Sequence, residues 1–211
     1  MRTSGVQCFS GGQEFPDLTE LRAAITKGDV RALGEVNAQY MGVAPNDARL
    51  EPYYVLAEEF DIPVGIHLGL GAPGVASPGP VFPQSKSPNC SGLAGDTRLL
   101  EPVLVRRPTL RLYAMQAAWP YLGEMKYLLY MHQQLYVDVS VLQYAVPRAT
   151  YYSYLKELVD VRFAARIMFG SGGSSRRLRE GVAAITEAEF LPPAQKRGIL
   201  HDNAVKFLRL P

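Results

Sequence analysis

The chain has 211 residues, of which 47 % are hydrophobic and 20 % are charged, and its formal net charge at pH 7 is +2. This length and this composition are typical of a globular protein, so we expect a single domain over residues 1–211 and neither a disordered nor a fibrous chain. Because the sequence holds no lysine-rich block or basic stripe, we expect no nucleic-acid role.

The sequence also limits where the protein works. Residues 1–12 lack the apolar core of a signal peptide, and no apolar run is long enough to span a membrane. We therefore predict a cytoplasmic protein that does not bind membranes. The two cysteines, Cys8 and Cys90, fit neither a metal knuckle nor a disulfide framework and are expected to be reduced thiols.

Short apolar runs bounded by glycine or proline are expected to be buried strands. In chain order they cover residues 5–10, 30–36, 63–69, 110–116, 135–140 and 165–171. Segments with helical character lie between them. The first is expected to begin with Asp17 as its N-cap, with Glu20 three residues later, and to end at Gly28.

Further helices are expected after the second, third, fourth and fifth strands. They are placed in residues 46–61, 120–134 and 149–160 and in the C-terminal segment 190–210. The last segment sets Leu200, Ala204, Phe207 and Leu208 on one helix face, which should cap the domain.

The alternation of strands and helices predicts an α/β architecture with right-handed crossovers, and a (β/α) barrel is favoured. The alternative is an open doubly wound sheet, which usually carries a glycine-rich phosphate loop after an early strand; none occurs there. Residues 69–92 are rich in glycine, proline and serine and directly follow a strand. On a barrel such a loop lies on the active face.

Several separated motifs resemble the amidohydrolase-related (amidohydrolase 2) family of TIM-barrel metal-dependent hydrolases and decarboxylases. From about Leu33 onward these are PVGIHLG, LRLYAMQAAWPYLGEM, LYVDVS, ARIMFGS and KRGILHDNAVKFLRL. The resemblance implies a barrel with one or two divalent metals at its C-terminal mouth. The first strand of that barrel has no counterpart here, so we expect a TIM-like barrel that is truncated at the N-terminus. A homodimer or an N-terminal segment is expected to cover its open edge.

The resemblance also implies metal ligands, of which few are retained. The family uses an HxH pair on the first strand, a histidine on the fifth, often one on the sixth, and an aspartate on the eighth. His67 stands in the place of the fifth-strand histidine, Gln116 in that of the sixth and Gly172 in that of the aspartate. Because a zinc site needs about three protein ligands, we expect no tightly bound metal. A weak oxygen-rich site of Glu35, His67 and Asp138 is the alternative.

Three residues are candidates for catalysis. His67 is the remaining histidine of the expected site, and Glu35 lies at a strand end, where a carboxylate beside an imidazole can serve as general base. For Glu35 a surface salt bridge is the alternative. Ser171 follows the last strand and could form a hydrolytic pair with His67.

Further residues are candidates for substrate binding. Trp119 is placed as a pocket wall or a packing residue at the barrel rim, and Asp138 either points into the barrel or hydrogen-bonds a neighbouring loop. Gln116 and Gly172 would face the same mouth, and the loop leading to Arg176 is suited to a small anion. We therefore expect a hydrolase of a small carbonyl substrate (an ester, lactone or amide) with weak or no metal dependence. The alternative is a catalytically silent homologue that binds a small anion or a partner.

Overall fold

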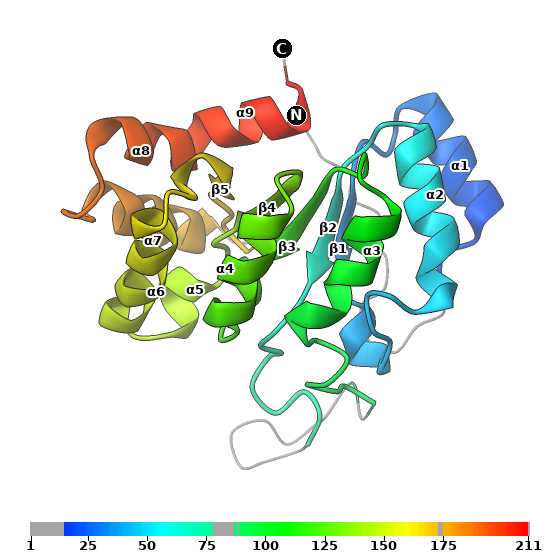
Figure 1. The fold of residues 1–211 in the computed structure, drawn as a ribbon, viewed down its shortest axis with the longest axis horizontal. Coiled ribbons are helices and arrows are strands. Elements are labelled where there is room, and N and C mark those ends of the chain that lie inside the picture. The colour runs from blue at the N-terminus through cyan, green and yellow to red at the C-terminus, as the bar shows by residue number, and fades with distance from the viewer. Residues whose placement is uncertain (1–14, 78–86, 88, 173–174, 211) are drawn as a thin grey trace. The chain divides into compact units, whose positions relative to one another are not determined.

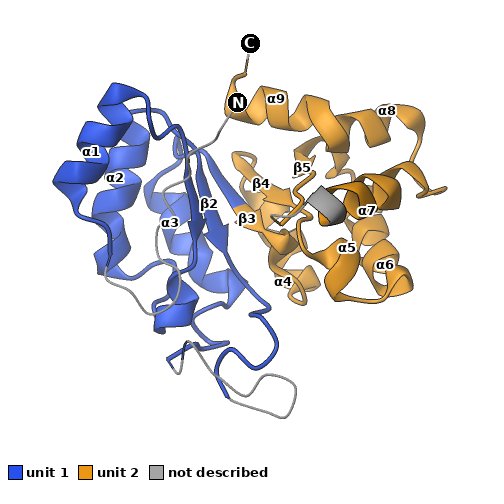
Figure 2. Cartoon of the chain, turned by 180° about the vertical axis from the view of Figure 1, so that it is seen from behind, with its two compact units in different colours: residues 1–113 blue, residues 114–211 orange. Residues whose placement is uncertain are grey.

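The computed structural model describes residues 15–77, 87, 89–172 and 175–210, and it is an α/β fold of short strands and alternating helices (Figure 1). Hydrogen bonds join the strands in chain order, β1-β2-β3-β4-β5. The chain divides into two compact units, residues 1–113 (unit 1) and residues 114–211 (unit 2), which are described separately below (Figure 2). The strand expected over residues 5–10 lies outside the described residues.

Unit 1 contains the first two strands and the helices that follow them. Its elements are α1 (Leu18–Lys27), β1 (Leu33–Val36), the 3-10 turns η1 (Ala38–Met41) and η2 (Ala48–Leu50), α2 (Glu51–Glu59), β2 (Val64–His67), the 3-10 turn η3 (Thr97–Leu100), α3 (Glu101–Arg106) and the beginning of β3 (Leu112–Met115).

The first helix follows its local signals. The Asp17 side chain accepts hydrogen bonds from the backbone N–H groups of Thr19 (2.8 Å) and Glu20 (2.9 Å), and Gly28 ends the helix with a φ of 83°. These contacts satisfy donors at the helix start and place at its end the residue that adopts a left-handed conformation without strain. The predicted boundaries of this helix are confirmed.

Strands β1 and β2 are parallel, with Leu33 opposite Val64 and Val36 opposite Ile66. All four of these side chains are at most 2 % exposed. In both views α1, α2 and α3 lie on one side of the two strands (Figures 1 and 2). Because parallel strands run in the same direction, their C-terminal ends meet at one edge of the sheet, and residues late in β1 and β2 come together there.

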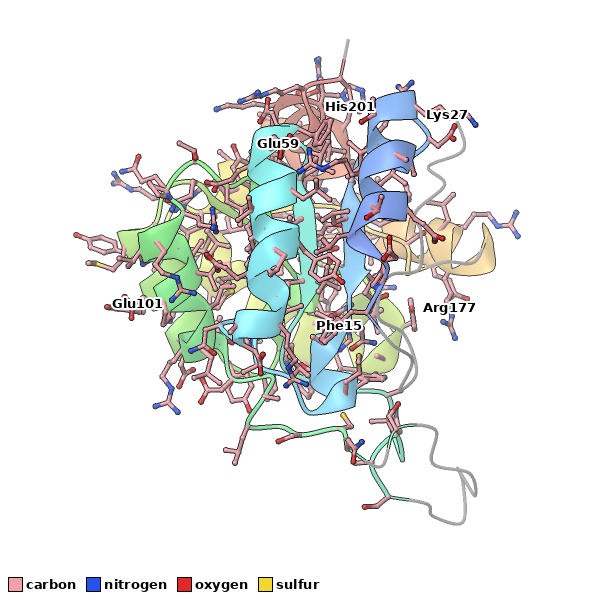
Figure 3. The ribbon with its side chains drawn as sticks, turned by 90° about the vertical axis from the view of Figure 1, so that its right-hand side faces the viewer. Phe15, Lys27, Glu59, Glu101, Arg177 and His201 are labelled. Carbon is pink, nitrogen blue, oxygen red and sulfur yellow. The ribbon has the colours of Figure 1, made fainter. Side chains whose placement is uncertain are left out.

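The helices of unit 1 present charged side chains on their outer faces, including Lys27, Glu59 and Glu101 (Figure 3). Glu59 on α2 forms an ion pair with Arg22 on α1, and both side chains are about half exposed. In solvent such a pair is screened, so the packing of α1 and α2 depends mainly on their apolar residues.

The other face of β2 is covered by an aromatic ring. A Cβ atom added to Gly65 would lie 2.3 Å from both Cζ and the hydroxyl oxygen of Tyr113. The ring therefore packs directly on the bare backbone of Gly65, and only glycine leaves room for it.

Replacing Gly65 with alanine is expected to lower the free energy of unfolding by about 1–3 kcal/mol, because the added methyl group forces the Tyr113 ring to move. Urea denaturation followed by circular dichroism measures the change. Gly123, inside α4 (Leu122–Met131), is the matched control, since an added Cβ would meet no atom within 4 Å there. Gly123→Ala should leave stability unchanged or raise it, and equal losses at the two glycines would contradict the proposed contact.

Unit 2 contains the remaining strands and most of the helices. Its elements are the end of β3, the turn η4 (Gln116–Ala118), α4, β4 (Leu135–Asp138), α5 (Leu142–Ala145), α6 (Arg148–Asp160), the turn η5 (Ala164–Arg166), β5 (Ile167–Met168), α7 (Ser175–Thr186), α8 (Pro193–Arg197), the π-helical turn η6 (Gly198–Asp202) and α9 (Asn203–Leu208). In the described ranges no helix combines the length and apolarity that crossing a membrane requires.

The C-terminal helices pack differently from the sequence prediction. Of the expected face, Phe207 is buried, but the other buried positions are Ile199 and Asn203 in place of Leu200 and Ala204. The π-helical turn η6 accommodates an extra residue and so changes the face that the helix buries. The Asn203 amide donates to two backbone carbonyl oxygens before and within β5, which fixes this arrangement.

Candidate functional site

The C-terminal ends of β1 and β2 bring Glu35 and His67 together. The Nδ1 atom of His67 lies 2.6 Å from Oε1 of Glu35. The imidazole is buried, with 8 % of its side chain exposed, whereas the carboxylate is 43 % exposed. The pair therefore has a buried half, which is held in place, and a half that solvent or a ligand can reach.

The second ring nitrogen of His67 is also occupied. Nε2 lies 3.0 Å from the backbone carbonyl oxygen of Leu70, in the loop that follows β2. A carbonyl oxygen only accepts hydrogen bonds, so Nε2 must carry a proton. Nδ1 and the Glu35 carboxyl group then share the other proton, as imidazolium and carboxylate or as imidazole and carboxylic acid. Either way, the two residues act as one proton-holding unit.

Residues after β1 hold this loop in place. The hydroxyl oxygen of Tyr40 accepts the backbone N–H of Ala72 (2.7 Å), and the side-chain amide of Gln39 donates to the carbonyl oxygen of Gly69 (3.1 Å). The Tyr40 ring also lies edge-on to His67, with ring centroids 5.3 Å apart. Burial raises the pKa of Tyr40 above its usual range, so its hydroxyl stays protonated at neutral pH.

A divalent metal would need ligands that these residues do not offer. Both nitrogens of His67 face oxygen atoms at hydrogen-bond distance, and within the described ranges no three His, Cys, Asp or Glu side chains gather as a metal site. Since a bound zinc ion takes about three protein ligands, the described residues do not fit a metal held at His67. The weak site of Glu35, His67 and Asp138 is not among the clusters found.

In unit 2, Asp138 ends β4 and lies in a buried hydrogen-bond network. Its Oδ1 atom accepts the backbone N–H of Gln116 (3.0 Å), the backbone N–H of Ser140 (2.9 Å) and the Ser140 hydroxyl group (2.6 Å). The Asp138 side chain is 6 % exposed. The carboxylate therefore connects the turn after β3 to the turn after β4. Of the two roles considered for Asp138, this geometry shows the bond to a neighbouring loop.

The position that the resemblance gives to an aspartate is closed to any side chain. Gly172 has a φ of 61°, and an added Cβ would lie 2.4 Å from the hydroxyl oxygen of Tyr144. Arg177 lies over the ring of Tyr144, at 4.3 Å from its centroid, and Nη1 donates to the tyrosine hydroxyl (3.3 Å). Arg177 itself points outward from the molecule (Figure 3). A phenol and a guanidinium group therefore stand where the family would have a carboxylate.

The other predicted residues of unit 2 are placed with less detail. Ser171 is half-buried and follows β5, and Trp119 is half-buried with its backbone N–H bonded to the carbonyl oxygen of Gln116 (3.0 Å). The side chain of Arg176 and residues 173–174 lie outside the described residues, so the anion site predicted there stays a prediction. The pairing of Ser171 with His67 also stays a prediction, because the two residues belong to different units.

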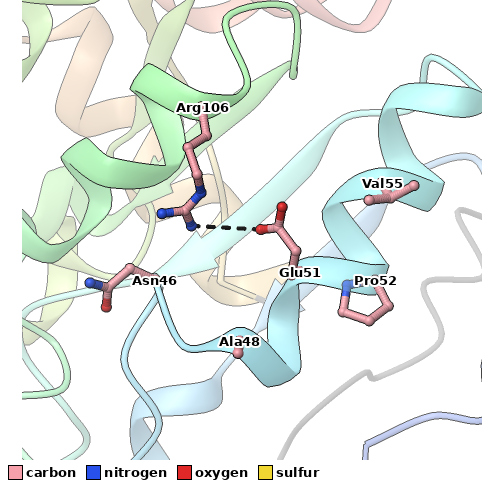
Figure 4. A pocket seen from close by; sticks show the side chains of 6 residues that line it. All are labelled: Asn46, Ala48, Glu51, Pro52, Val55 and Arg106. Atoms are coloured by element: carbon pink, nitrogen blue, oxygen red, sulfur yellow. Dashed lines mark ion pairs between the residues drawn. The ribbon is translucent and has the colours of Figure 1, made fainter.

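A surface pocket of unit 1 is separate from all predicted site residues. It encloses about 540 Å³ and is lined by Asn46, Ala48, Glu51, Pro52, Val55 and Arg106 (Figure 4). Its carboxylate is already used, since Glu51 lies 2.6 Å from Arg107 and 3.6 Å from Arg106. The pocket therefore offers no catalytic group.

Several residues of these clusters were missed from the sequence. Ser140 follows Asp138 by two positions, a spacing at which an aspartate side chain commonly accepts the backbone N–H, and this signal could have revealed the bracket. The carbonyl oxygen of Leu70 and the hydroxyl of Tyr40 carry no such signal, because their roles depend on how two loops pack.

Comparisons with known proteins agree with this fold. The chain matches a family model described as amidohydrolase over residues 12–210. Among solved structures, it is similar to an uncharacterized TIM-barrel protein from Bordetella bronchiseptica, with a TM-score of 0.66 and 19 % identity over 91 % of this chain and 61 % of that one. No curated protein sequence matches the chain.

Two similar structures are named as enzymes. The 5-carboxyvanillate decarboxylase of Sphingomonas paucimobilis has a TM-score of 0.65 and 13 % identity, over 91 % of this chain and 62 % of that one. A probable 2-pyrone-4,6-dicarboxylic acid hydrolase of Acinetobacter baumannii has a TM-score of 0.63 and 12 % identity, over 96 % and 72 %. The chain thus spans about three fifths of the length of the first of these structures. At these identities the likeness shows the fold, a parallel (β/α) arrangement of the TIM-barrel kind.

Proposed function

Because the chain belongs to the amidohydrolase family, we propose that it hydrolyses a small carbonyl substrate, an ester, lactone or amide, with Glu35 and His67 as the catalytic pair. The observation that carries the proposal is the 2.6 Å hydrogen bond between Glu35 and His67 at the C-terminal ends of neighbouring parallel strands. This is the end of the strands at which barrels of this kind carry their chemistry.

The proposed reaction uses the exposed half of the pair. In its ionised form the Glu35 carboxylate accepts a proton from a water molecule as the water oxygen attacks the substrate carbonyl carbon. His67 donates a hydrogen bond to this carboxylate and keeps it oriented, while the Leu70 carbonyl oxygen fixes the imidazole. Collapse of the tetrahedral intermediate breaks the bond to the leaving oxygen or nitrogen, which takes the proton back from Glu35.

Two observations support the substrate class and the weak metal dependence. The named neighbours include a hydrolase and a decarboxylase of small carboxylated compounds, so a small carbonyl compound is consistent with the family's fold. Both nitrogens of His67 are held by oxygen atoms, which leaves none for a metal in this arrangement. Hydrolysis that depends on Glu35 does not need a metal at His67.

The experiment is an assay of 4-nitrophenyl acetate, a simple lactone and a simple anilide with and without EDTA. We expect turnover of at least one of the three, unchanged by EDTA and unchanged in Ser171→Ala. Loss of all turnover with EDTA would contradict the metal-independent pair, and loss in Ser171→Ala would favour the serine as nucleophile. Absence of turnover in the unmodified protein would favour the silent homologue that only binds a ligand.

A further inference from the structure

Gln116 has a buried side chain whose acceptor is unused. Gln116 is 3 % exposed, and its Oε1 atom has no hydrogen-bond partner. Buried polar atoms in folded proteins are almost always hydrogen-bonded, because leaving one unpaired costs its whole solvation. A buried amide that keeps an unpaired acceptor therefore points to a donor that comes from outside the chain.

The backbone around this amide is fixed, so the side chain cannot easily turn to another partner. The Gln116 N–H is bound by the Asp138 carboxylate, and the carbonyl oxygen of Ala117 accepts the Tyr154 hydroxyl (2.8 Å). Gln116, Ala117 and Ala118 all have positive φ angles, of 51°, 46° and 53°. Three such residues in succession persist only where their surroundings impose them, and such segments gather at ligand sites.

The alternative explanation, that the amide only fills space, is weaker. A methionine or leucine of similar volume would fill the same space in this apolar unit without an unpaired oxygen. A local choice that lowers stability without an evident structural gain is characteristic of functional positions. The exposed neighbour Gln133, in the turn after α4, shows no such burial.

We propose that Gln116 is the binding group of a subsite in unit 2 for a small carboxamide. The ligand's N–H donates to Oε1 of Gln116, and its carbonyl oxygen accepts from Nε2, so that the two amide groups pair edge to edge. An ester or a lactone has no donor and leaves Oε1 unpaired. The subsite concerns binding alone and stands whether or not the proposed hydrolysis occurs.

The test is a titration followed by the side-chain amide signals of glutamine in ¹H–¹⁵N NMR spectra. The Gln116 signals are those that disappear in Gln116→Met. We expect propionamide to shift them with saturation, and methyl propionate, its ester counterpart, to bind at least about tenfold more weakly. Equal responses to the two compounds, or no response to propionamide, would overturn the proposal; the second result would assign Oε1 to a bound water molecule.

A thermal melt separates a binding role from a structural one. Since Gln116→Met removes an unpaired buried oxygen and keeps the volume, its melting temperature should equal or exceed that of the unmodified protein. A lower melting temperature would show that the amide supports the fold and would overturn the proposal. Gln133→Met is the matched control, which should keep both the melting temperature and the shift of the Gln116 signals with propionamide.

Discussion

Asp138→Ala is expected to lower the free energy of unfolding by about 3–5 kcal/mol, measured by urea denaturation. The reason is the number of donors that lose their acceptor at once. The N–H groups of Gln116 and Ser140 and the Ser140 hydroxyl all bond to one carboxylate oxygen, in a place that water scarcely reaches. Each buried donor left unpaired costs about 1–3 kcal/mol, only part of which relaxation can recover.

Two milder variants test whether the loss comes from the hydrogen bonds. Asp138→Asn keeps a side-chain oxygen that can accept the backbone N–H groups, so it should lose clearly less stability than Asp138→Ala. Ser140→Ala removes only one of the three donors and should cost about 1 kcal/mol. An alanine variant as stable as the unmodified protein would show that Asp138 does not hold the two turns together.

The parts of the fold that were predictable are those fixed by neighbours in sequence. Asp17 and Gly28 marked the first helix because a cap requires a side-chain acceptor at one end and a left-handed residue at the other. The C-terminal face was mispredicted for the opposite reason. Which residues it buries depends on Asn203 reaching the backbone near β5, a contact between segments far apart in the chain.

The same distinction applies to the candidate site. Parallel strands place their C-terminal residues at one edge, so the sequence was enough to suggest that Glu35 and His67 belong together. It could not show that the Leu70 carbonyl oxygen occupies the other ring nitrogen, which settles where the protons lie. Likewise, a glycine at position 172 indicated a missing carboxylate, but only the structure shows the Tyr144 hydroxyl in its place.

Glu35→Gln is expected to lower kcat for the substrate that the protein turns over by about 10²–10⁴-fold, the usual contribution of a general base. A glutamine keeps the size of the side chain and can still bond to His67, but it cannot take a proton from water. The binding of substrate should change little, so KM is expected to stay near its original value. Steady-state kinetics of the two proteins gives both parameters.

Controls separate the loss of the base from general damage. Glu59→Gln removes an exposed carboxylate that pairs with Arg22 on the helix surface, and it should leave kcat unchanged. Because Glu35 and His67 hold their protons jointly, the double variant Glu35→Gln/His67→Ala should lose little more activity than Glu35→Gln alone. If the two losses multiply instead, the residues act independently, and the 2.6 Å hydrogen bond does not make them one catalytic unit.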